Sequence, residues 1–367
     1  MIWENYLYKI TRYNLYMVSL IVPAAGKSSR FHGKPKWIRT CPNGNLMLQE
    51  CIVNLDLSDV DAIYITLLKE HINQHCNDLD VQSLFKFVQK PVHILLLDHC
   101  TSSQPETIVK TIENFHISGS IFIKDVDSFF NAIVPSGNYI SCVKVDDYQL
   151  SNISNKSFLQ VNSENTVVNI VEKRIVSNII SVGGYGFQDT NEFLKSYYTC
   201  TEVSNINKTE LFTSHIIYHL LTQGKVFNKY KVSGYNDVGT EKEWLQYKQQ
   251  FKAYFVDIDG TLFYNASEHF HPIWGQSEPL LHNIESIKKM YQCGKCHIVL
   301  TTARKETFRE ATIHQLKKYN VPFHDIIFNL PHCHRVLIND FSDSNPYPSA
   351  VAINIKRDND DLHFFLR

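Results

Sequence analysis

The feature that most constrains this chain is a short apolar segment that breaks abruptly into a small, basic loop. Residues 20–23, Leu-Ile-Val-Pro, have the character of a buried parallel strand. Three small residues follow, and they let the backbone turn tightly and approach a ligand closely: Ala24, Ala25 and Gly26. The loop then supplies two hydroxyls and three cations: Ser28, Ser29, Arg30, Lys34 and Lys36. A strand, a small-residue loop and clustered cations together predict a site for a polyphosphate.

This segment resembles the signature loop of the sugar-phosphate nucleotidyltransferases, A-G-G-x-G-[ST]-R followed shortly by P-K. The matching residues are Gly26, Ser29, Arg30, Pro35 and Lys36, while Ala25 and Ser28 stand where the family has glycine. The resemblance implies that Arg30 and Lys36 act on the triphosphate during catalysis. It also implies that the loop binds the nucleotide through Ala24, Ala25, Gly26, Ser28 and Ser29. Taken alone, so short a match also fits an ordinary basic connection between a strand and a helix.

Strand-like and helix-like segments alternate after this loop. Apolar strands are expected at residues 62–66, 93–97 and 120–124, with helices at 46–54, 69–76 and 106–115. Such alternation indicates a parallel sheet that binds its ligands at the carboxyl ends of the strands. We therefore expect an α/β fold, and the resemblance makes it a Rossmann-like nucleotidyltransferase domain.

One polar segment, Thr101 to Thr107, follows the third strand and opens a helix. A similar segment of the nucleotidyltransferases, T-x-G-x-A-E-T, helps to hold the nucleobase. The resemblance thus implies that Gln104 and Glu106 bind the nucleotide. The same residues also fit a plain helix start, with a capping residue and Glu106 in the first turn.

The fourth strand ends in a second polar segment, Lys124-Asp125-Val126-Asp127. Carboxylates at this edge are well placed to hold Mg²⁺ against nucleotide phosphates. Asp127 matches the metal-binding aspartate of the nucleotidyltransferases. Asp-x-Asp is also the metal motif of many glycosyltransferases with a related nucleotide-binding fold. A glycosyltransferase that uses Asp125 and Asp127 therefore stays open as an alternative.

Two later segments extend the resemblance to residue 240. Residues 171–187 resemble the family's E-K…S…G-x-Y-x-F run, which implies that Glu172, Lys173 and Gly184 hold the acceptor phosphate. Residues 234–240 resemble W-x-D-x-G-T, in which Asp237 would be the second metal ligand. The implied reaction is attack by a sugar or polyol phosphate on the α-phosphorus of an NTP, with Mg²⁺ bound and pyrophosphate leaving. Residues 241–250 are expected to form a helix that ends the domain.

A new apolar strand starts at residue 252 and ends in Asp257-Ile258-Asp259-Gly260-Thr261. This resembles the first motif of the haloacid-dehalogenase-like (HAD) phosphohydrolases. The resemblance implies that Asp257 is the nucleophile and Asp259 the acid/base, and that both face a second Mg²⁺.

The later HAD motifs are assigned to three segments. A strand at residues 297–301 ends in hydroxyls, of which Thr302 is the expected phosphate ligand. A strand at 336–340 would bring Asp340 to the metal, with Asp343 just beyond it, and Arg335 is the nearest cation for the phosphate. The segment between Leu262 and a helix at 284–291 is too short for a large cap domain.

The composition excludes several classes of protein. An apolar content of 44% with 20% charged residues is typical of a globular chain. The net charge of −1 argues against binding to nucleic acid or to an anionic membrane, and no apolar run is long enough to span a bilayer. Nine cysteines, an odd number, favour the cytoplasm over a disulfide framework. The pair Cys293 and Cys296, with Cys333, keeps a zinc site as an alternative.

We therefore expect an N-terminal extension at residues 1–16, a nucleotidyltransferase domain at 17–250 and a smaller HAD-like phosphohydrolase domain at 251–367. The function hypothesis is a bifunctional enzyme of activated-sugar synthesis, of the surface-polysaccharide type, that uses an NTP and a sugar or polyol phosphate. Two alternatives remain, namely a catalytically silent HAD-like tail and the glycosyltransferase, which would release NDP. The sequence leaves the NTP, the acceptor and a homo-oligomeric state open.

Overall fold

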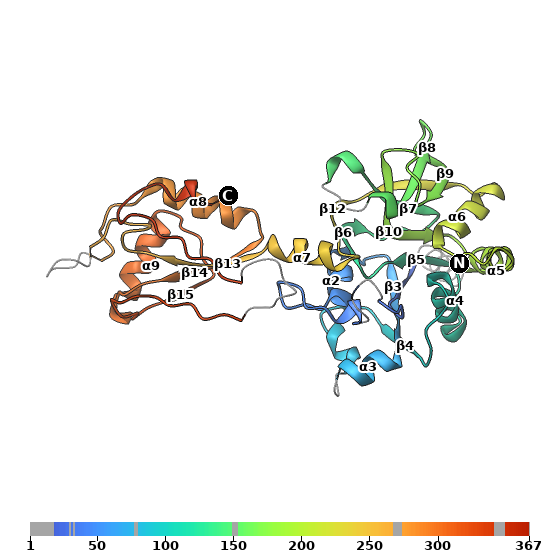
Figure 1. The fold of residues 1–367 in the computed structure, drawn as a ribbon, viewed down its shortest axis with the longest axis horizontal. Coiled ribbons are helices and arrows are strands. Elements are labelled where there is room, and N and C mark those ends of the chain that lie inside the picture. Colours follow the sequence, from blue (N-terminus) through green and yellow to red (C-terminus); the bar gives the residue numbers. More distant parts are fainter. Residues whose placement is uncertain are drawn as a thin grey trace, which may run out of the picture. The chain divides into compact units, whose positions relative to one another are not determined.

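The computed structural model describes residues 18–28, 31, 34–76, 80–148, 153–266, 274–340 and 349–366. The chain divides into two compact units, Met1–Tyr247 and Lys248–Arg367, which are described separately below (Figure 1). Several residues of the sequence hypotheses lie outside the described part: the extension 1–16, Ser29, Arg30 and Asp343.

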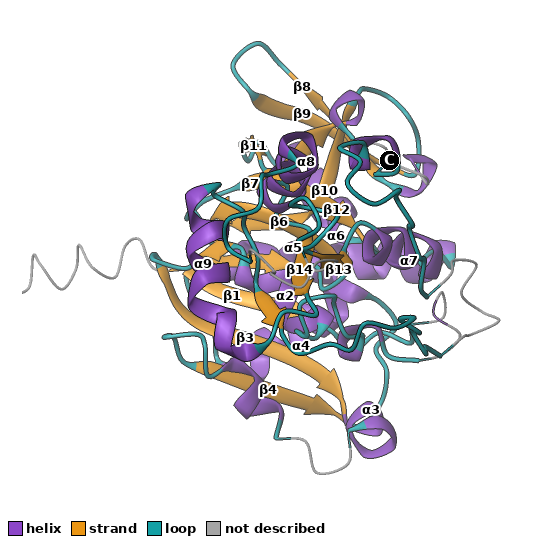
Figure 2. Cartoon of the chain, turned by 90° about the vertical axis from the view of Figure 1, so that its left-hand side faces the viewer, coloured by secondary structure: helices purple, strands orange, loops and turns teal. Residues whose placement is uncertain are grey.

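Unit 1 is built on a nine-stranded sheet with the order β4-β3-β1-β5-β10-β7-β11-β9-β8. Its strands are β1 (Val18–Pro23), β3 (Val60–Leu68), β4 (Val92–Leu97), β5 (Ser120–Lys124), β7 (Tyr139–Lys144), β8 (Ser157–Val161), β9 (Thr166–Glu172), β10 (Ile179–Phe187) and β11 (Phe227–Lys231). Strands β4, β3, β1 and β5 are parallel, as predicted, and β1, β3 and β4 lie side by side in Figure 2.

The second half of this sheet departs from the predicted parallel arrangement, because β10 is antiparallel to both β5 and β7. Strands β7, β8, β9 and β10 follow one another without an intervening α-helix, and a parallel pair needs a long crossover. Strands β8 and β9 instead form an antiparallel hairpin, seen at the top of Figure 2. The sheet is therefore mixed, and the expectation of a purely parallel sheet was wrong here.

The helices of unit 1 are α2 (Met47–Val53), α3 (Lys69–His75), α4 (Gln104–Phe115), α5 (Thr190–Asn207), α6 (Thr213–Thr222) and α7 (Glu241–Gln249). Three of them, α4, α5 and α6, share one apolar core with the sheet through fully or almost fully buried side chains, among them Ile21, Ile108, Ile123, Phe193 and Ile216. Apolar residues at helical spacing thus cover the sheet, and the loops at its edge are left to form a site.

A small second sheet joins distant parts of unit 1. It has the order β12-β6-β2 and contains β2 (Leu55–Asp56), β6 (Ser128–Ile133) and β12 (Ser233–Asp237). Strand β12 is antiparallel to β6, with Asp237 opposite Ser128, and the Val238 N–H donates to the Asp127 carbonyl oxygen at 3.0 Å. The pairing brings Asp237 and Val238 beside Asp127, in the turn that follows β5.

Unit 2 contains a three-stranded parallel sheet with the order β13-β14-β15. Its strands are β13 (Lys252–Asp257), β14 (Cys296–Thr301) and β15 (Asp325–Ile327), and its helices are α8 (Leu281–Gln292) and α9 (Arg309–Lys318). The two helices link the strands as crossovers, as parallel pairing requires. Ile258, Ile284, Ile298 and Leu316 are buried in their shared core.

The strand predicted at residues 336–340 is absent, although residues 331–340 are described. Val336 and Ile338 are 80% and 89% exposed, and the third strand of the sheet is β15 instead. An apolar run becomes a strand only when another strand pairs with it, and this run has no ladder partner among the described strands. The prediction for Asp340, which rested on that strand, loses its structural basis.

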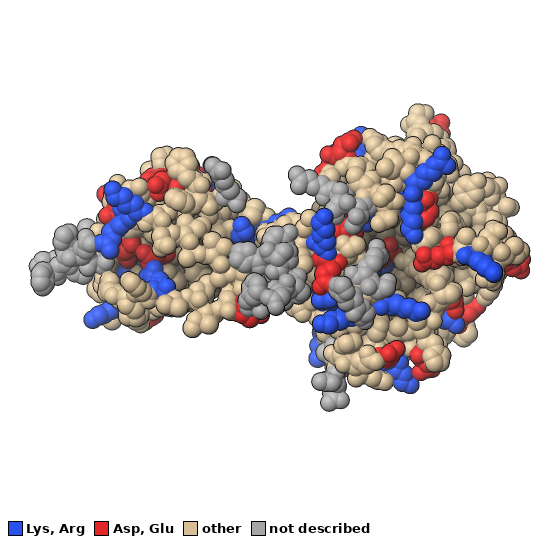
Figure 3. Space-filling view, in the orientation of Figure 1, with Lys and Arg blue, Asp and Glu red and all other residues tan. Residues whose placement is uncertain are grey.

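Short 3-10 turns complete the described structure at η2 (Lys36–Ile38), η3 (Val81–Phe85), η4 (Val145–Asp147), η5 (Ile153–Asn155), η6 (Glu306–Phe308) and η7 (Leu362–Phe364). Across the described ranges, every helix falls short of the length and apolar character that crossing a membrane demands. On the face drawn in Figure 3, basic and acidic side chains alternate over the surface.

A chain truncated after Gln250 should fold without unit 2, because helix α7 packs into unit 1. Trp244 and Tyr247 are 3% and 6% exposed, and Tyr247 packs edge-on against Phe129 with ring centroids 5.3 Å apart. A chain truncated after Gly239 loses both aromatic side chains, each worth about 3–5 kcal/mol in a core. Circular dichroism melting should show a cooperative transition for the first truncation and a much lower midpoint for the second. Aggregation of the chain that ends at Gln250 would contradict this division.

Candidate functional site

A cavity of about 770 Å³ lies in unit 1, at the ends of β1, β5, β9 and β12. It is lined by nine of the residues that the sequence analysis proposed for the nucleotide, the acceptor and the metal: Ala24, Gly26, Ser28, Lys36, Gln104, Asp127, Glu172, Lys173 and Asp237. Segments that are more than two hundred residues apart in the sequence, roughly the span of a whole domain, thus meet at one place.

The basic loop folds back on itself so that Lys36 points into this cavity. The Lys36 N–H donates to the Ser28 hydroxyl at 3.0 Å, and the neighbouring Trp37 is buried, with an exposure of 1%. Ser28 has a φ of +50°, in the left-handed region that favours glycine. The nucleotidyltransferase motif has glycine at this position. The Lys36 ammonium reaches the Asp127 carboxylate at 2.5 Å.

The carboxylates of Asp127 and Asp237 both lie beside Gly239, and both residues line the cavity. A Cβ atom added to Gly239 would lie 3.3 Å from Asp127 Oδ2 and 3.3 Å from Asp237 Oδ1. Each carboxylate also has a lysine partner, Lys36 on Asp127 and Lys156 on Asp237. Burial raises the pKa of Asp237, and the ion pair with Lys156 opposes that shift.

This carboxylate pair fits a Mg²⁺ ion that completes its shell with substrate oxygens. Mg²⁺ is usually held by one or two carboxylates together with phosphate oxygens and water. Among the described residues no three His, Cys, Asp or Glu side chains gather as a metal site, so the protein offers the pair and no complete cage. Gly239 contributes no side chain beside the two carboxylates, both of which line the cavity, and this suits such an ion.

Lys156 was missed by the sequence analysis. It directly precedes β8, whose partner strand β9 ends at Glu172, and Ser157 lies opposite Glu172 in the register. Only this hairpin register carries Lys156 to the site. A lysine just before a strand is common in sequences, and no motif marked this one.

Asp125 takes a different position from Asp127. Its carboxylate accepts a hydrogen bond from Gln104 Nε2 at 2.6 Å, and its N–H donates to the Gly183 carbonyl oxygen at 2.8 Å. Burial, reinforced by the nearby Asp127, raises the pKa of Asp125 to about 6. The buried Lys124 ammonium donates to the Asp125 carbonyl oxygen at 2.7 Å and so braces this turn.

The segment that opens α4 is engaged within the protein. Gln104 lines the cavity, but its amide both donates to Asp125 and accepts from the Thr213 hydroxyl at 2.9 Å. Glu106 does not line the cavity; its carboxylate accepts from the N–H and hydroxyl of Ser102, each at 2.7 Å. Ser103 caps the helix. For Glu106, the structure therefore matches the helix-start interpretation.

Two more residues predicted to bind ligands lie behind the cavity wall. Ala25 is 1% exposed, and its carbonyl oxygen accepts from Cys100 Sγ at 3.4 Å. A Cβ on Gly184 would lie 2.5 Å from Ser141 Oγ and 2.9 Å from Phe130 Cζ, so packing against these side chains requires glycine there. Neither residue lines the cavity, and Gly183 lines it instead of Gly184.

Glu172 and Lys173 lie together on another wall of the cavity. Glu172 Oε2 accepts from the Ser214 hydroxyl at 2.7 Å and also from Ser157. Lys173 has a φ of +53°, and its ammonium lies 4.1 Å from the centroid of the Phe212 ring. The end of β9 thus places one carboxylate and one cation next to each other, with the cation held over an aromatic face.

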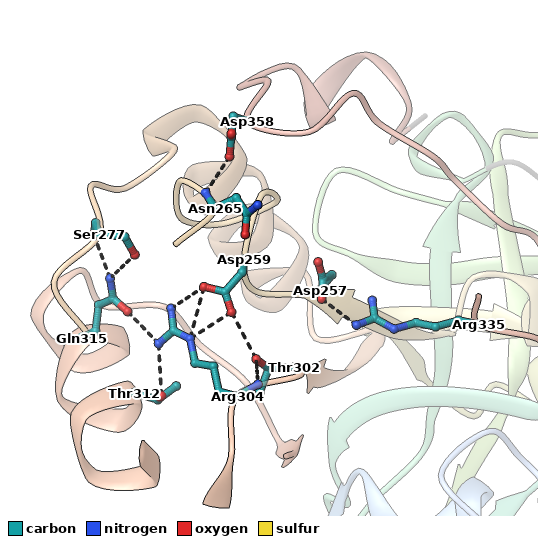
Figure 4. Close-up of polar contacts among 10 residues, drawn as sticks. All are labelled: Asp257, Asp259, Asn265, Ser277, Thr302, Arg304, Thr312, Gln315, Arg335 and Asp358. Carbon is teal, nitrogen blue, oxygen red and sulfur yellow. Dashed lines mark hydrogen bonds and ion pairs between the residues drawn. The ribbon is translucent and has the colours of Figure 1, made fainter. Parts of the chain in front are cut away.

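In unit 2, Asp259 is held by a buried arginine that the sequence analysis did not single out (Figure 4). Arg304 is fully buried and donates from Nη2 to Asp259 Oδ1 at 2.8 Å and from Nε to Oδ2 at 3.0 Å. Its remaining nitrogen, Nη1, donates to Thr312 Oγ1 at 3.1 Å and to Gln315 Oε1 at 2.9 Å. The network ties the loop after β13 to helix α9.

Of the other predicted residues of unit 2, Arg335 and Thr302 contact the two aspartates, whereas Asp340 belongs to no metal-holding group with them in the described residues. Arg335 Nη2 lies 2.9 Å from Asp257 Oδ1; burial raises the pKa of Asp257 and Arg335 opposes that shift. Thr302 is fully buried and donates to Asp259 Oδ2 at 3.2 Å. Asp340 is exposed and forms no group of metal-holding side chains with Asp257 and Asp259 in the described part of the chain.

The same finding bears on zinc, because Cys293, Cys296 and Cys333 form no metal-holding group within the described ranges. Cys293 and Cys333 are exposed, and Cys296 is partly exposed. The zinc alternative therefore has no structural support in this unit.

Gly183→Ala should displace Asp125 as well as strain the backbone. Gly183 has a φ of +77°, and an added Cβ would lie 2.4 Å from Asp125 Oδ2. Gly119→Ala is a matched control, since Gly119 has a φ of +84° and nothing within 4 Å of the added atom. Urea unfolding should show a loss of about 1 kcal/mol for the control and about 1–3 kcal/mol more for Gly183→Ala. Equal losses would show that Asp125 yields freely.

Arg304→Met should destabilise unit 2 strongly, since it leaves a buried carboxylate without its partner. The expected loss is about 3–5 kcal/mol, measured by urea unfolding. Adding Asp259→Asn should restore part of it. Arg309→Met, which removes an exposed ion pair with Glu306 and a contact with the Phe328 ring, should cost about 1–2 kcal/mol. Similar losses for the two single arginine variants would refute a supporting role for the buried network.

No family model and no curated protein matches the sequence. Solved structures do match it. A nucleoside-diphosphate-sugar pyrophosphorylase from Vibrio cholerae RC9 is 18% identical, with a TM-score of 0.52 over 63% of this chain and 99% of the other. A protein assigned as a glucose-1-phosphate thymidylyltransferase from Bacillus anthracis, crystallised with sucrose, is 16% identical, with a TM-score of 0.50 over 64% and 94%.

The matched share is about twice the length of unit 2, so the likeness extends well into unit 1. At such low identity the likeness concerns the fold alone. The chain accordingly shares a mixed α/β fold with nucleotidyltransferase-like proteins.

Proposed function

We propose that unit 1 transfers a nucleotidyl group from an NTP to a sugar or polyol phosphate and releases pyrophosphate. The observation that carries the proposal is the Asp127 and Asp237 pair: both carboxylates line the cavity, both lie beside Gly239, and each holds a lysine. The cavity around the pair also contains the basic loop and the Glu172–Lys173 wall. The fold shared with nucleotidyltransferase-like structures supports the same reaction.

The residues of this cavity would act mainly by positioning and by neutralising charge. Lys36 would bind the triphosphate, and Glu172 and Lys173 would bind the acceptor. Arg30, which lies outside the described residues, is proposed from its motif to assist Lys36. A Mg²⁺ held by Asp127 and Asp237 would neutralise charge that develops on the phosphates. The acceptor phosphate is already a nucleophile near neutral pH, so no general base is needed. Its oxygen bonds to the α-phosphorus while the bond to pyrophosphate breaks.

The direct test is a panel of NTPs against phosphorylated sugars and polyols, with pyrophosphate release as the readout. Release that depends on both substrates supports the proposal. Release of NDP from a nucleotide sugar would favour the glycosyltransferase. Asp125 gives that rival less support, because its carboxylate binds Gln104, whereas the carboxylates of Asp127 and Asp237 both lie beside Gly239.

Asp127→Asn and Asp237→Asn should each reduce pyrophosphate release by at least about a hundredfold while the fold is retained. Each change removes one of the two charged ligands proposed for the metal. Asp147→Asn is the control, because Asp147 forms an exposed ion pair with Lys231. Initial rates at saturating Mg²⁺, with circular dichroism of each variant, make the comparison. Near-normal turnover in either cavity variant would disprove the metal assignment.

For unit 2 we propose the phosphohydrolase reaction expected from Asp257-Ile258-Asp259, with Asp257 as nucleophile and Asp259 as acid/base. Arg335, beside Asp257, would bind the phosphate, and Thr302 would assist from the end of β14. The described structure does not join Asp340 to the expected Mg²⁺ site, so no step is assigned to a metal here. The rival, a silent tail, has its support in the contacts that occupy Asp259: Arg304 binds both carboxylate oxygens, and Thr302 binds Oδ2.

Asp257→Asn should abolish hydrolysis of p-nitrophenyl phosphate and leave pyrophosphate release within about twofold of the wild type, as expected for sites in separate domains. Both activities are measured on the full chain. A wild-type chain without phosphatase activity would support the silent tail. A large drop in pyrophosphate release would mean that unit 2 supports unit 1.

We further propose that the product is an activated sugar or polyol for surface-polysaccharide synthesis in the cytoplasm. A chain with both activities could remove one phosphate and cap another with a nucleotide. This pairing of activities is the support for the pathway assignment.

A further inference from the structure

Lys156 occupies a position that neither the sequence motifs nor the reaction proposed above uses. It lies between η5 and β8, and its ammonium pairs with Asp237 Oδ2. The Lys156 and Asp237 side chains are 21% and 8% exposed, and both residues line the cavity. This pair is matched by a second one, Lys36 with Asp127, and both carboxylates lie beside Gly239.

The backbone around Lys156 is tied to the wall proposed for the acceptor. The Lys173 N–H donates to the Lys156 carbonyl oxygen at 3.0 Å, and the adjacent Ser157 binds Glu172. Lys156 therefore lies between the carboxylate pair and the Glu172–Lys173 wall. A cation at this point is within the region where the phosphates of both substrates would converge.

The charges of the four side chains balance in pairs. Two carboxylates and two ammonium groups sum to zero, so neither carboxylate carries an uncompensated charge at this partly buried site. If Asp127 and Asp237 serve a divalent cation, each lysine loses its partner. Two ammonium groups then remain beside the cavity, where phosphate oxygens can replace the carboxylates as acceptors.

We propose that Lys156 is a further catalytic residue that exchanges partners. It holds Asp237 in the free protein and binds a substrate phosphate once Asp237 serves the metal. This inference rests on the proposed function of unit 1. The ligand chemistry is a phosphate group of either the nucleotide or the acceptor.

The exchange predicts opposite effects on two ligands when Lys156 is replaced by Gln. Without its competitor, Asp237 should bind Mn²⁺ roughly three- to tenfold more tightly in the absence of phosphate. With Mn²⁺ saturating, phosphate should bind roughly tenfold more weakly, because a charged donor is lost. Mn²⁺ binding is followed by electron paramagnetic resonance and phosphate binding by calorimetry. Pyrophosphate and inorganic phosphate serve as separate probes for the nucleotide and acceptor sides.

Two further variants complete the design. Lys156→Arg keeps the charge and should retain near-wild-type Mn²⁺ affinity and most of the phosphate affinity. Lys225→Gln removes a lysine that pairs with Glu192 and does not line the cavity, and it should change neither affinity. Thermal melting of all variants identifies any loss of fold. If Lys156→Gln is unfolded, the phosphate and Mn²⁺ affinities of Lys156→Arg are compared with the wild type instead.

Tighter Mn²⁺ binding with weaker binding of one phosphate probe supports the proposal, and the affected probe shows which substrate Lys156 contacts. Weaker Mn²⁺ binding in Lys156→Gln would overturn it, since Lys156 would then only position Asp237. Unchanged affinities would overturn it as well. If Asp127→Asn and Asp237→Asn leave Mn²⁺ binding intact, the proposed metal site itself fails, and this result is distinct from a failure of Lys156.

Discussion

The pairing of β12 with β6 is the interaction on which the candidate site depends. Asp127 lies in the turn between β5 and β6, directly before β6, whereas Asp237 comes from a strand more than a hundred residues later in the chain. The hydrogen bond from the Val238 N–H to the Asp127 carbonyl oxygen fixes the register of the two segments. A shift by one residue would turn the Asp237 side chain to the other face of the small sheet and separate the carboxylates.

The pairing of β12 with β6 places two carboxylates close together, and two lysines in the cavity compensate their negative charge. Two carboxylates beside one glycine repel each other, and burial already penalises Asp237 in its ionised form. Lysines from two different loops offset that cost, one on each carboxylate. The arrangement leaves both signs of charge available to a ligand, which is useful where a divalent cation and phosphates bind together.

Unit 2 distributes its charges differently. Asp259 and Arg304 form a buried pair whose remaining donors are satisfied by Thr312 and Gln315, so this part of the unit is a rigid network. Asp257 is more accessible, and its partner Arg335 is half exposed. The contrast explains why the same two-carboxylate motif supports both an active and a silent interpretation. Turnover assays, and not contacts, separate them.

The sequence alone determined the local elements and the chemical character of the loops. Apolar runs predicted β1, β3, β4, β5, β13 and β14. Of these, β1, β3, β5 and β14 lie inside their sheets, where burial requires such residues, whereas β4 and β13 are edge strands. Motif order also predicted that Lys36, Asp127, Lys173 and Asp237 would share one site, and these four residues line one cavity.

Only the tertiary structure decided what depends on pairing between distant segments. The antiparallel entry of β10, the missing strand at residues 336–340 and the position of Lys156 all follow from strand partners and register. The residues next to a given position in the sequence do not specify which distant strand pairs with it or in which register. The same holds for Glu106 and Gly184, which match a motif by residue type. In the structure, Glu106 accepts a hydrogen bond from the Ser102 N–H at the start of the helix, and Gly184 packs against buried side chains. Local sequence thus set which groups were available, and long-range hydrogen bonding and burial set which of them reach the cavity.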